Sequence, residues 1–160
     1  MIVVTGNAPR SGTSAMMRAL LEYYEPHSYC EKFPAYVASI CNPDGFWDLN
    51  EAEITKTDSI PTEPNTVIKL WANHLRRVNA DDVKVLVHMV RRDFQAQVQS
   101  IFKTAIAEGF RPDPETVSKL FITQDYLINE LFVNTPKIVV DMEDFRKNPK
   151  QFISSIREIL

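Results

Sequence analysis

The start of the chain constrains the fold most, because an apolar run changes into a helical pattern across a turn that holds two of the four glycines. Residues 2–6, IVVTG, are rich in β-branched side chains and end in glycine, which predicts a short buried strand. From Gly12 the apolar residues recur at helical spacing, with Met16, Leu20 and Tyr24 on one face. A strand that turns directly into a helix points successive backbone N–H groups and the helix dipole toward one spot, which suits a phosphate group.

Strand-like and helix-like segments alternate along the rest of the chain. The strand patterns cover 66–71, 82–92 and 137–142, and the helical patterns cover 94–105, 113–132 and 149–159. Residues 28–31 are a candidate second strand, and the polar, proline-rich residues 41–66 are expected to be irregular with room for one short helix. This alternation predicts one α/β domain over 1–160, with a mostly parallel sheet of about five strands in a three-layer α/β/α arrangement.

Composition excludes several classes of protein. The 160 residues are 44% hydrophobic and 24% charged, as in one globular domain with a packed core. A net charge of −3 provides no general basic surface, so neither nucleic acid nor an anionic membrane is an expected partner. No stretch reaches the roughly 18 apolar residues that a membrane span needs. Cys30 and Cys41 lack metal-ligand spacing, and reduced thiols in a cytoplasmic protein without a metal are the simpler expectation.

The turn differs from the phosphate loop of ATP- and GTP-hydrolysing enzymes. That loop has two glycines five positions apart and a lysine directly after the second, which neutralises charge on the transferred phosphoryl group. Here Gly6 and Gly12 are six positions apart, and Thr13 stands where the lysine would be. The difference counts against phosphoryl transfer from ATP or GTP.

Residues 9–14, PRSGTS, resemble the 5′-phosphosulfate-binding loop of the sulfotransferases, which have a P-loop-like fold and use 3′-phosphoadenosine 5′-phosphosulfate (PAPS). The resemblance implies a catalytic Arg10 near the oxygen that bridges phosphate and sulfate, where charge accumulates as the S–O bond breaks. It implies PAPS as the donor, 3′,5′-ADP as its product, and no required metal. The donor-binding residues that it implies are Pro9, Arg10, Ser11, Gly12, Thr13 and Ser14.

A second element of the sulfotransferases is a strand that ends in arginine, followed eight positions later by a helical serine, and both bind the 3′-phosphate of the donor. Arg92 and Ser100 resemble this pair, although the proline that often follows the arginine is absent. The resemblance is looser in residues 42–48, NPDGFWD, in residues 67–71, VIKLW, and in residues 137–152. It therefore runs along most of the chain.

The base that would take the proton of the acceptor is less clearly marked. Lys69 matches a lysine of the family, but Trp71 occupies the position of the histidine that often follows it. His74 is a nearby alternative, although a place on a helix surface is the favoured interpretation for it. A second family solution uses a glutamate about twenty residues beyond the loop, and Glu31 lies twenty-one residues after Arg10. Glu31 is therefore the preferred candidate base.

Three functions remain open at this point. The first is a PAPS-dependent sulfotransferase that acts on a hydroxyl or amine of a small-molecule, carbohydrate or peptide acceptor. The second is a small-molecule or nucleotide kinase with a divergent phosphate loop, for which Asp141 is the nearest candidate Mg²⁺ ligand. The third is a non-catalytic relative that binds PAPS or its product. His88, inside an apolar strand, is expected to be a buried structural residue. The oligomeric state cannot be read from the sequence.

Overall fold

The computed structural model describes residues 1–24, 27–28, 30–33, 46–49, 60 and 65–160. Its strands are β1 (Ile2–Gly6), β2 (His27–Ser28), β3 (Cys30–Phe33), β4 (Phe46–Leu49), β5 (Thr66–Lys69), β6 (Val85–Val90) and β7 (Lys137–Asp141). Its helices are α1 (Thr13–Tyr24), α3 (Ala72–Leu75), the 3₁₀ turn η1 (Ala80–Asp82), α4 (Phe94–Ala107), α5 (Pro114–Leu131), α6 (Met142–Lys147) and α7 (Pro149–Ile159).

Five parallel strands form the central sheet in the order β2-β5-β1-β6-β7, so the predicted α/β class is confirmed. The first strand lies at the centre, and the chain continues to opposite sides of it. Val4 faces Lys69 in β5 on one side and Val87 in β6 on the other. In such sheets ligands bind beyond the carboxyl ends of the strands, at the point where the strand order reverses. That point is the loop after β1.

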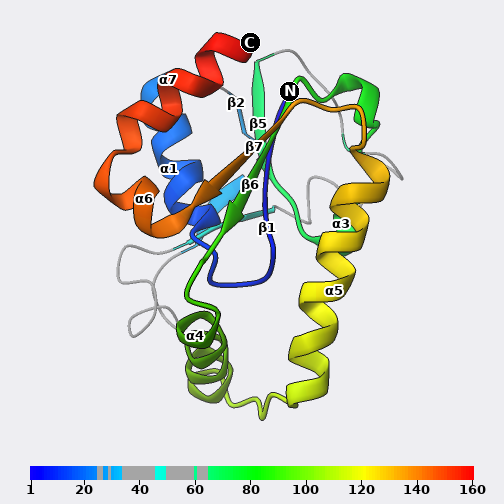
Figure 1. The fold of residues 1–160 in the computed structure, drawn as a ribbon, viewed down its shortest axis with the longest axis vertical. Coiled ribbons are helices and arrows are strands. Elements are labelled where there is room, and N and C mark those ends of the chain that lie inside the picture. The colour runs from blue at the N-terminus through cyan, green and yellow to red at the C-terminus, as the bar shows by residue number, and fades with distance from the viewer. Residues whose placement is uncertain (25–26, 29, 34–45, 50–59, 61–64) are drawn as a thin grey trace.

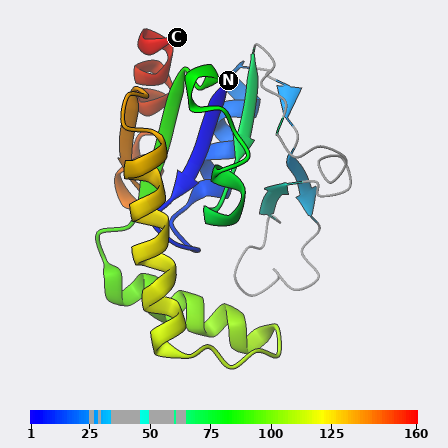
Figure 2. The ribbon, with the colours of Figure 1, turned by 90° about the vertical axis from the view of Figure 1, so that its right-hand side faces the viewer.

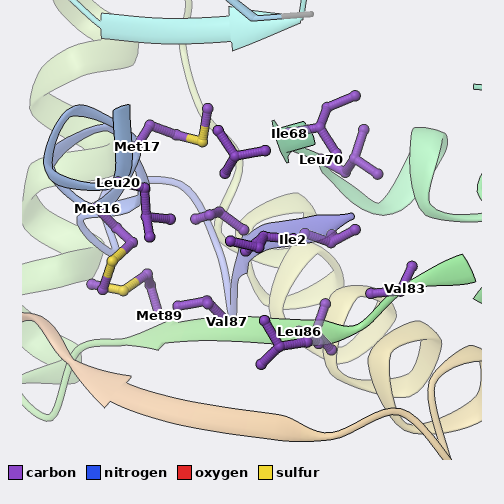
Figure 3. Packing of buried hydrophobic residues seen from close by; sticks show 14 of the residues in the cluster. Ile2, Met16, Met17, Leu20, Ile68, Leu70, Val83, Leu86, Val87 and Met89 are labelled. Carbon is purple, nitrogen blue, oxygen red and sulfur yellow. The ribbon is translucent and has the colours of Figure 1, made fainter. Parts of the chain in front are cut away.

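Helices cover both faces of the sheet, as the expected three-layer arrangement requires. Figure 1 shows α1, α6 and α7 on one side and α3 with α5 on the other. The core between these layers is apolar, and Figure 3 shows Met16, Met17 and Leu20 of α1 packed toward the strands. Leu127 and Ile128 on the C-terminal half of α5 are buried in the same core. Their burial explains why apolar residues recur at helical spacing in residues 113–132 of the sequence.

Several sequence-based boundaries were wrong. The candidate strand 28–31 is divided, because β2 joins the central sheet while β3 pairs in antiparallel fashion with β4. Residues 41–66 were expected to be irregular before the strand predicted at 66–71, yet they contain β4, and the short helix expected there lies outside the described residues. Cys41 also lies outside them. The helices α3 and α6 were not expected, because four and six residues are too few to show a period.

Two helices extend beyond the carboxyl edge of the sheet. Figures 1 and 2 show α4 and the N-terminal half of α5 on that side, next to the loop that follows β1. A small apolar cluster of Ala8, Ile101 and Val117 joins the loop to both helices. The rings of Phe94 and Phe121 pack with centroids 5.0 Å apart. The loop after β1 therefore has a packed support of its own, separate from the main core.

Candidate functional site

The loop between β1 and α1 bends through left-handed backbone at two positions. Arg10 has φ 69° and Gly12 has φ 94°. Left-handed backbone is energetically costly for arginine, so contacts with the surrounding residues must stabilise it. Within the described residues, the backbone N–H groups of Ser11, Gly12 and Thr13 have no hydrogen-bond partner. Consecutive unpaired N–H groups at a helix start are the donors that an anion needs.

Both glycines of the loop lie where another part of the chain approaches closely. A Cβ atom at Gly6 would stand 1.9 Å from the Oγ of Ser11, so the Ser11 side chain points at the end of β1. A Cβ atom at Gly12 would stand 2.6 Å from the Cγ of Met142, the first residue of α6. The Ser11 hydroxyl is buried and has no partner in the part of the chain that the structure describes. The loop is thus tightly packed, and among the described residues it contains a buried Ser11 hydroxyl without a hydrogen-bond partner.

Gln97 of α4 holds the loop from below. Its side-chain nitrogen donates to the Oδ1 of Asn7 at 3.1 Å and to the carbonyl oxygens of Ala8 at 3.4 Å and Pro9 at 3.0 Å. Gln97 is fully buried, and these bonds draw the loop carbonyls toward α4. Sequence reasoning missed this residue. Its position three residues before Ser100 places both on one helix face, which was the available signal.

Arg10 and Ser100, predicted separately as donor-binding residues, lie in contact. The Nε of Arg10 donates to the Oγ of Ser100 at 3.0 Å, and Ser100 is half-buried on α4. The structure therefore brings two predicted site residues together although they are 90 positions apart. Thr13, buried, and Ser14, half-buried, begin α1 directly above the loop. The carbonyl of Pro9 faces α4 and this residue has no N–H, so its backbone offers the loop no donor.

Arg92 lies beyond the end of β6 among carboxylates. Its guanidinium is 2.5 Å from the Oδ2 of Asp144 and 3.6 Å from the Oδ2 of Asp141, and its side chain is 73% exposed. The backbone N–H of Arg92 also donates to Asp141. The expected pairing of Arg92 with Ser100 on one ligand is thus not preformed, because Ser100 contacts Arg10 and Arg92 contacts the two aspartates.

Asp141, the candidate Mg²⁺ ligand of the kinase hypothesis, is buried at the end of β7. One oxygen accepts hydrogen bonds from the backbone N–H groups of Glu143 and Asp144, which begin α6, and the other faces Arg92. This carboxylate is engaged as a helix cap and an ion-pair partner. Among the described residues there is no group of three or more histidine, cysteine or acidic side chains that would suit a metal ion.

The candidate base residues have different positions. Lys69 ends β5, is buried, and places its Nζ 5.4 Å from the centroid of the Trp71 ring. His74 is half-buried in α3, where its Nδ1 lies 3.4 Å from an Nη of Arg77. Glu31 lies in β3 opposite Asp48, and its side chain is outside what the structure describes. Lys69 is therefore the candidate that the sheet itself brings beside β1.

A mostly apolar pocket of about 370 Å³ opens between the loop and α5. Its lining residues are Ala8, Pro9, Trp71, Thr116, Lys119, Leu120, Thr123 and Gln124. Gln124 ties this wall to the sheet, because its amide donates to the Oγ1 of Thr5 at 2.6 Å and that hydroxyl donates to the carbonyl of Leu70. Sequence reasoning assigned α5 to the core and missed its N-terminal half as a wall of the site.

His88 is buried in β6, as expected, and its register partner in β1 is Thr5. Burial lowers the pKa of this imidazole, and the carboxylate of Asp125 opposes that shift more than Lys137 reinforces it. Its Nε2 has no partner within the described chain. Burial therefore favours the neutral form of this imidazole.

Comparison with known proteins adds information on the fold. No protein-family model and no curated protein sequence matches the chain. A solved structure that does match is a deoxyadenosine kinase from M. mycoides with the products dCMP and a flexible dCDP bound. The match has a TM-score of 0.60 and 12% identity, and it covers 100% of both chains. The chain thus has an α/β fold similar to that of this kinase. No helix in the described part is long and apolar enough to span a membrane.

Proposed function

We propose that this protein is a nucleotide-dependent transferase whose loop at residues 6–14 binds the donor, and that the donor is PAPS. The observation that carries the proposal is Arg10, a cation in left-handed backbone that contacts Ser100 beside three unpaired backbone N–H groups. The loop contains no lysine, so Arg10 supplies its positive charge. A guanidinium at that point suits a bridging oxygen between phosphate and sulfate.

The residues of the loop fit a phosphosulfate group on three counts. The N–H groups of Ser11, Gly12 and Thr13 are available donors. The buried hydroxyl of Ser11 lacks a partner, and a ligand oxygen would satisfy it. Gly6 and Gly12 allow Ser11 and Met142 to approach the backbone closely, which fixes the path of the loop that carries these donors. PAPS supplies the sulfuryl group, and the chain supplies binding and charge stabilisation.

In the proposed reaction the acceptor oxygen or nitrogen attacks sulfur, and the bond from sulfur to the 5′-phosphate oxygen breaks. The electron pair leaves on that phosphate oxygen as 3′,5′-ADP forms. Arg10 stabilises the developing charge, and the ammonium of Lys69 adds positive potential from the neighbouring strand. Glu31 is retained as the base that takes the acceptor proton, with His74 as the alternative.

A nucleoside or small-molecule kinase is the second candidate, and the likeness to deoxyadenosine kinase favours it over a sulfotransferase. Two features of the site oppose it. Thr13 occupies the position of the loop lysine that kinases of this fold use. Asp141 is already committed to the start of α6 and to Arg92, so it is a poor Mg²⁺ ligand. These features are the reason to rank PAPS ahead of ATP.

The donor is identified by thermal denaturation of the protein with 3′,5′-ADP, 5′-AMP and ATP, the last with and without Mg²⁺. The proposal expects 3′,5′-ADP to raise the melting temperature most, with no Mg²⁺ dependence. A larger shift with ATP and Mg²⁺ would establish the kinase candidate instead. Sulfate transfer from PAPS is then followed by mass spectrometry of an acceptor mixture. Binding of 3′,5′-ADP with no sulfated product would identify a non-catalytic relative.

A further inference from the structure

We propose that Gln97 is a positioning residue of the donor loop. Its buried side-chain amide orients the loop so that Arg10 and the unpaired backbone N–H groups of residues 11–13 can bind an anion together. The assignment of that anion to PAPS rests on the proposed function. The role of Gln97 concerns any sulfate or phosphate group in the loop, so the two proposals can be tested separately.

The amide nitrogen of Gln97 contacts three oxygen atoms of the loop at once. The Oδ1 of Asn7 and the carbonyl oxygens of Ala8 and Pro9 lie 3.1, 3.4 and 3.0 Å from it. These oxygens carry partial negative charge, and the two hydrogens of the amide hold them together and directed at α4. An oxygen that is not held in this way could turn toward a bound anion, which it would repel.

The hydrogen bond to Pro9 also fixes the backbone that enters Arg10. In the trans peptide that joins these two residues, the C=O and the N–H groups point in opposite directions. The Pro9 carbonyl that accepts from Gln97 therefore directs the Arg10 N–H away from α4. Arg10 has left-handed backbone with φ 69°, a costly conformation that needs such a contact to persist.

Gln97 and Ser100 hold Arg10 at two points. They are three positions apart on α4, so both side chains lie on one face of that helix. Ser100 accepts a hydrogen bond from the Nε of Arg10 at 3.0 Å, while Gln97 donates to the carbonyl of the preceding residue. One helix face thus contacts both the side chain of Arg10 and the main chain that leads into it. This attachment reduces the freedom that the arginine loses when an anion binds.

The burial of Gln97 supports a role in the loop over one in core packing. The side chain is fully buried, and its Oε1 has no hydrogen-bond partner within the described residues. A buried carbonyl without a partner costs stability, and an apolar side chain of similar size would avoid that cost. The hydrogen bonds of the amide nitrogen to the loop are the contribution that offsets it.

The experiment measures sulfate binding by isothermal titration calorimetry at constant ionic strength and at pH 6, 7.5 and 9. Sulfate keeps its charge over this range, so a change in affinity comes from the protein. Gln97→Met removes the amide but keeps a side chain of similar volume. Gln97→Glu replaces the donor nitrogen by an oxygen, which can donate only when the carboxyl is protonated. Gln99→Glu is the matched control, because Gln99 is exposed on the same helix.

Q97M should weaken sulfate binding about 10-fold at every pH. Q97E should weaken it at least as much at pH 9 and recover to within about threefold of the parent at pH 6, because burial beside oxygen atoms raises the pKa of a carboxyl. Q99E should follow the parent protein throughout. Affinities like that of the parent in Q97M and Q97E, even with lowered melting temperatures, would overturn the assignment. An effect of Q97E that does not change with pH would overturn it as well.

Titrations of the parent and of Q97M with 3′,5′-ADP, and with ATP and Mg²⁺, separate this role from the identity of the donor. If Q97M weakens sulfate but the parent prefers ATP, the donor proposal fails and the role of Gln97 stands. If the parent prefers 3′,5′-ADP and Q97M binds it equally well, the role of Gln97 fails and the donor proposal stands. A parent protein that binds neither sulfate nor a nucleotide would overturn both.

Discussion

Two arginines stand beyond the carboxyl ends of neighbouring central strands, and their surroundings differ. Arg10 follows β1 in left-handed backbone, contacts the neutral hydroxyl of Ser100, and lies among backbone donors. Arg92 follows β6 and lies against the carboxylates of Asp141 and Asp144. The same residue type at the same sheet edge thus has a different role. The backbone donors beside Arg10 suit an anion, whereas the carboxylates around Arg92 compete with one.

The loop that carries Arg10 and the strand end that carries Arg92 are also held in place by different interactions. The loop gains its shape from close approaches, at Gly6 to Ser11 and at Gly12 to Met142, and from the grip of Gln97. The region around Arg92 is held by ion pairs, and the pair between Arg92 and Asp144 is exposed to solvent. Packed backbone holds donors in place at any ionic strength, whereas exposed ion pairs weaken as salt is added. The donor site should therefore be more rigid on the side of Arg10.

Arg10→Ala is expected to have the largest effect on ligand binding. Loss of charge-assisted hydrogen bonds to a phosphate or sulfate costs about 3 kcal/mol, so the affinity for 3′,5′-ADP should fall about 100-fold. Isothermal titration calorimetry measures it directly. Arg111→Ala, which removes an exposed arginine outside the site, is the control and should bind like the parent protein. Equal affinity of R10A and R111A would remove Arg10 from the site.

Gly6→Ala tests whether close approach shapes the loop. The added Cβ would meet the Oγ of Ser11 at 1.9 Å, so the free energy of unfolding should fall by about 2 kcal/mol in urea denaturation. In the double variant G6A/S11A the hydroxyl is gone, and most of that loss should be recovered. Ser11→Ala alone should be nearly neutral, because the hydroxyl has no partner. Additive losses in the double variant would show that the contact is not the cause.

Arg92→Ala should weaken 3′,5′-ADP by less than about 10-fold, because Asp141 and Asp144 already neutralise this arginine. Asp144→Asn removes one of those charges and should tighten binding about two- to three-fold at low salt. Titrations of both variants at low and high salt measure the effects. If R92A instead loses as much as R10A, the arginine leaves its aspartates when the nucleotide binds, and the two arginines act as a pair.

The order of elements could be predicted from the sequence because it depends on periodicity and on local signals. Residues 2–6 are all buried in β1, and Pro114 starts α5 behind the capping side chain of Asp113. The division of residues 27–33 between two sheets could not be predicted. Their partners are β5 and β4, at long distance in the sequence, and pairing of that kind leaves no mark in a four-residue segment.

The residues of the loop could be predicted from the sequence, but the residues that hold the loop in place could not. Glycine spacing and hydroxyls mark residues 6–14 directly, whereas Gln97 and Gln124 act through contacts across 88 to 119 positions of chain. The residue type alone does not distinguish a buried glutamine from a solvated one, and the signal for Gln97 was only its place on the same helix face as Ser100. The engagement of Arg92 by Asp141 and Asp144 was hidden in the same way, since it joins the ends of β6 and β7.

His88 supplies the smallest expected effect, and it concerns the fold away from the two arginines. Burial lowers its pKa below 6.5, so the unfolded chain binds the proton more readily than the folded one. Stability should therefore decline as pH falls below about 6.5, by at most about 1.4 kcal/mol per pH unit. Urea denaturation at pH 7.5, 6.5 and 5.5 measures that slope.

His88→Gln removes the titrating group and should flatten this dependence, while His74→Gln, which keeps His88, should retain it. The affinity for 3′,5′-ADP should be unaffected by His88→Gln, because His88 lies within the sheet and the donor loop lies beyond its edge. A slope that H88Q leaves intact would show that His88 is not the cause of the pH dependence.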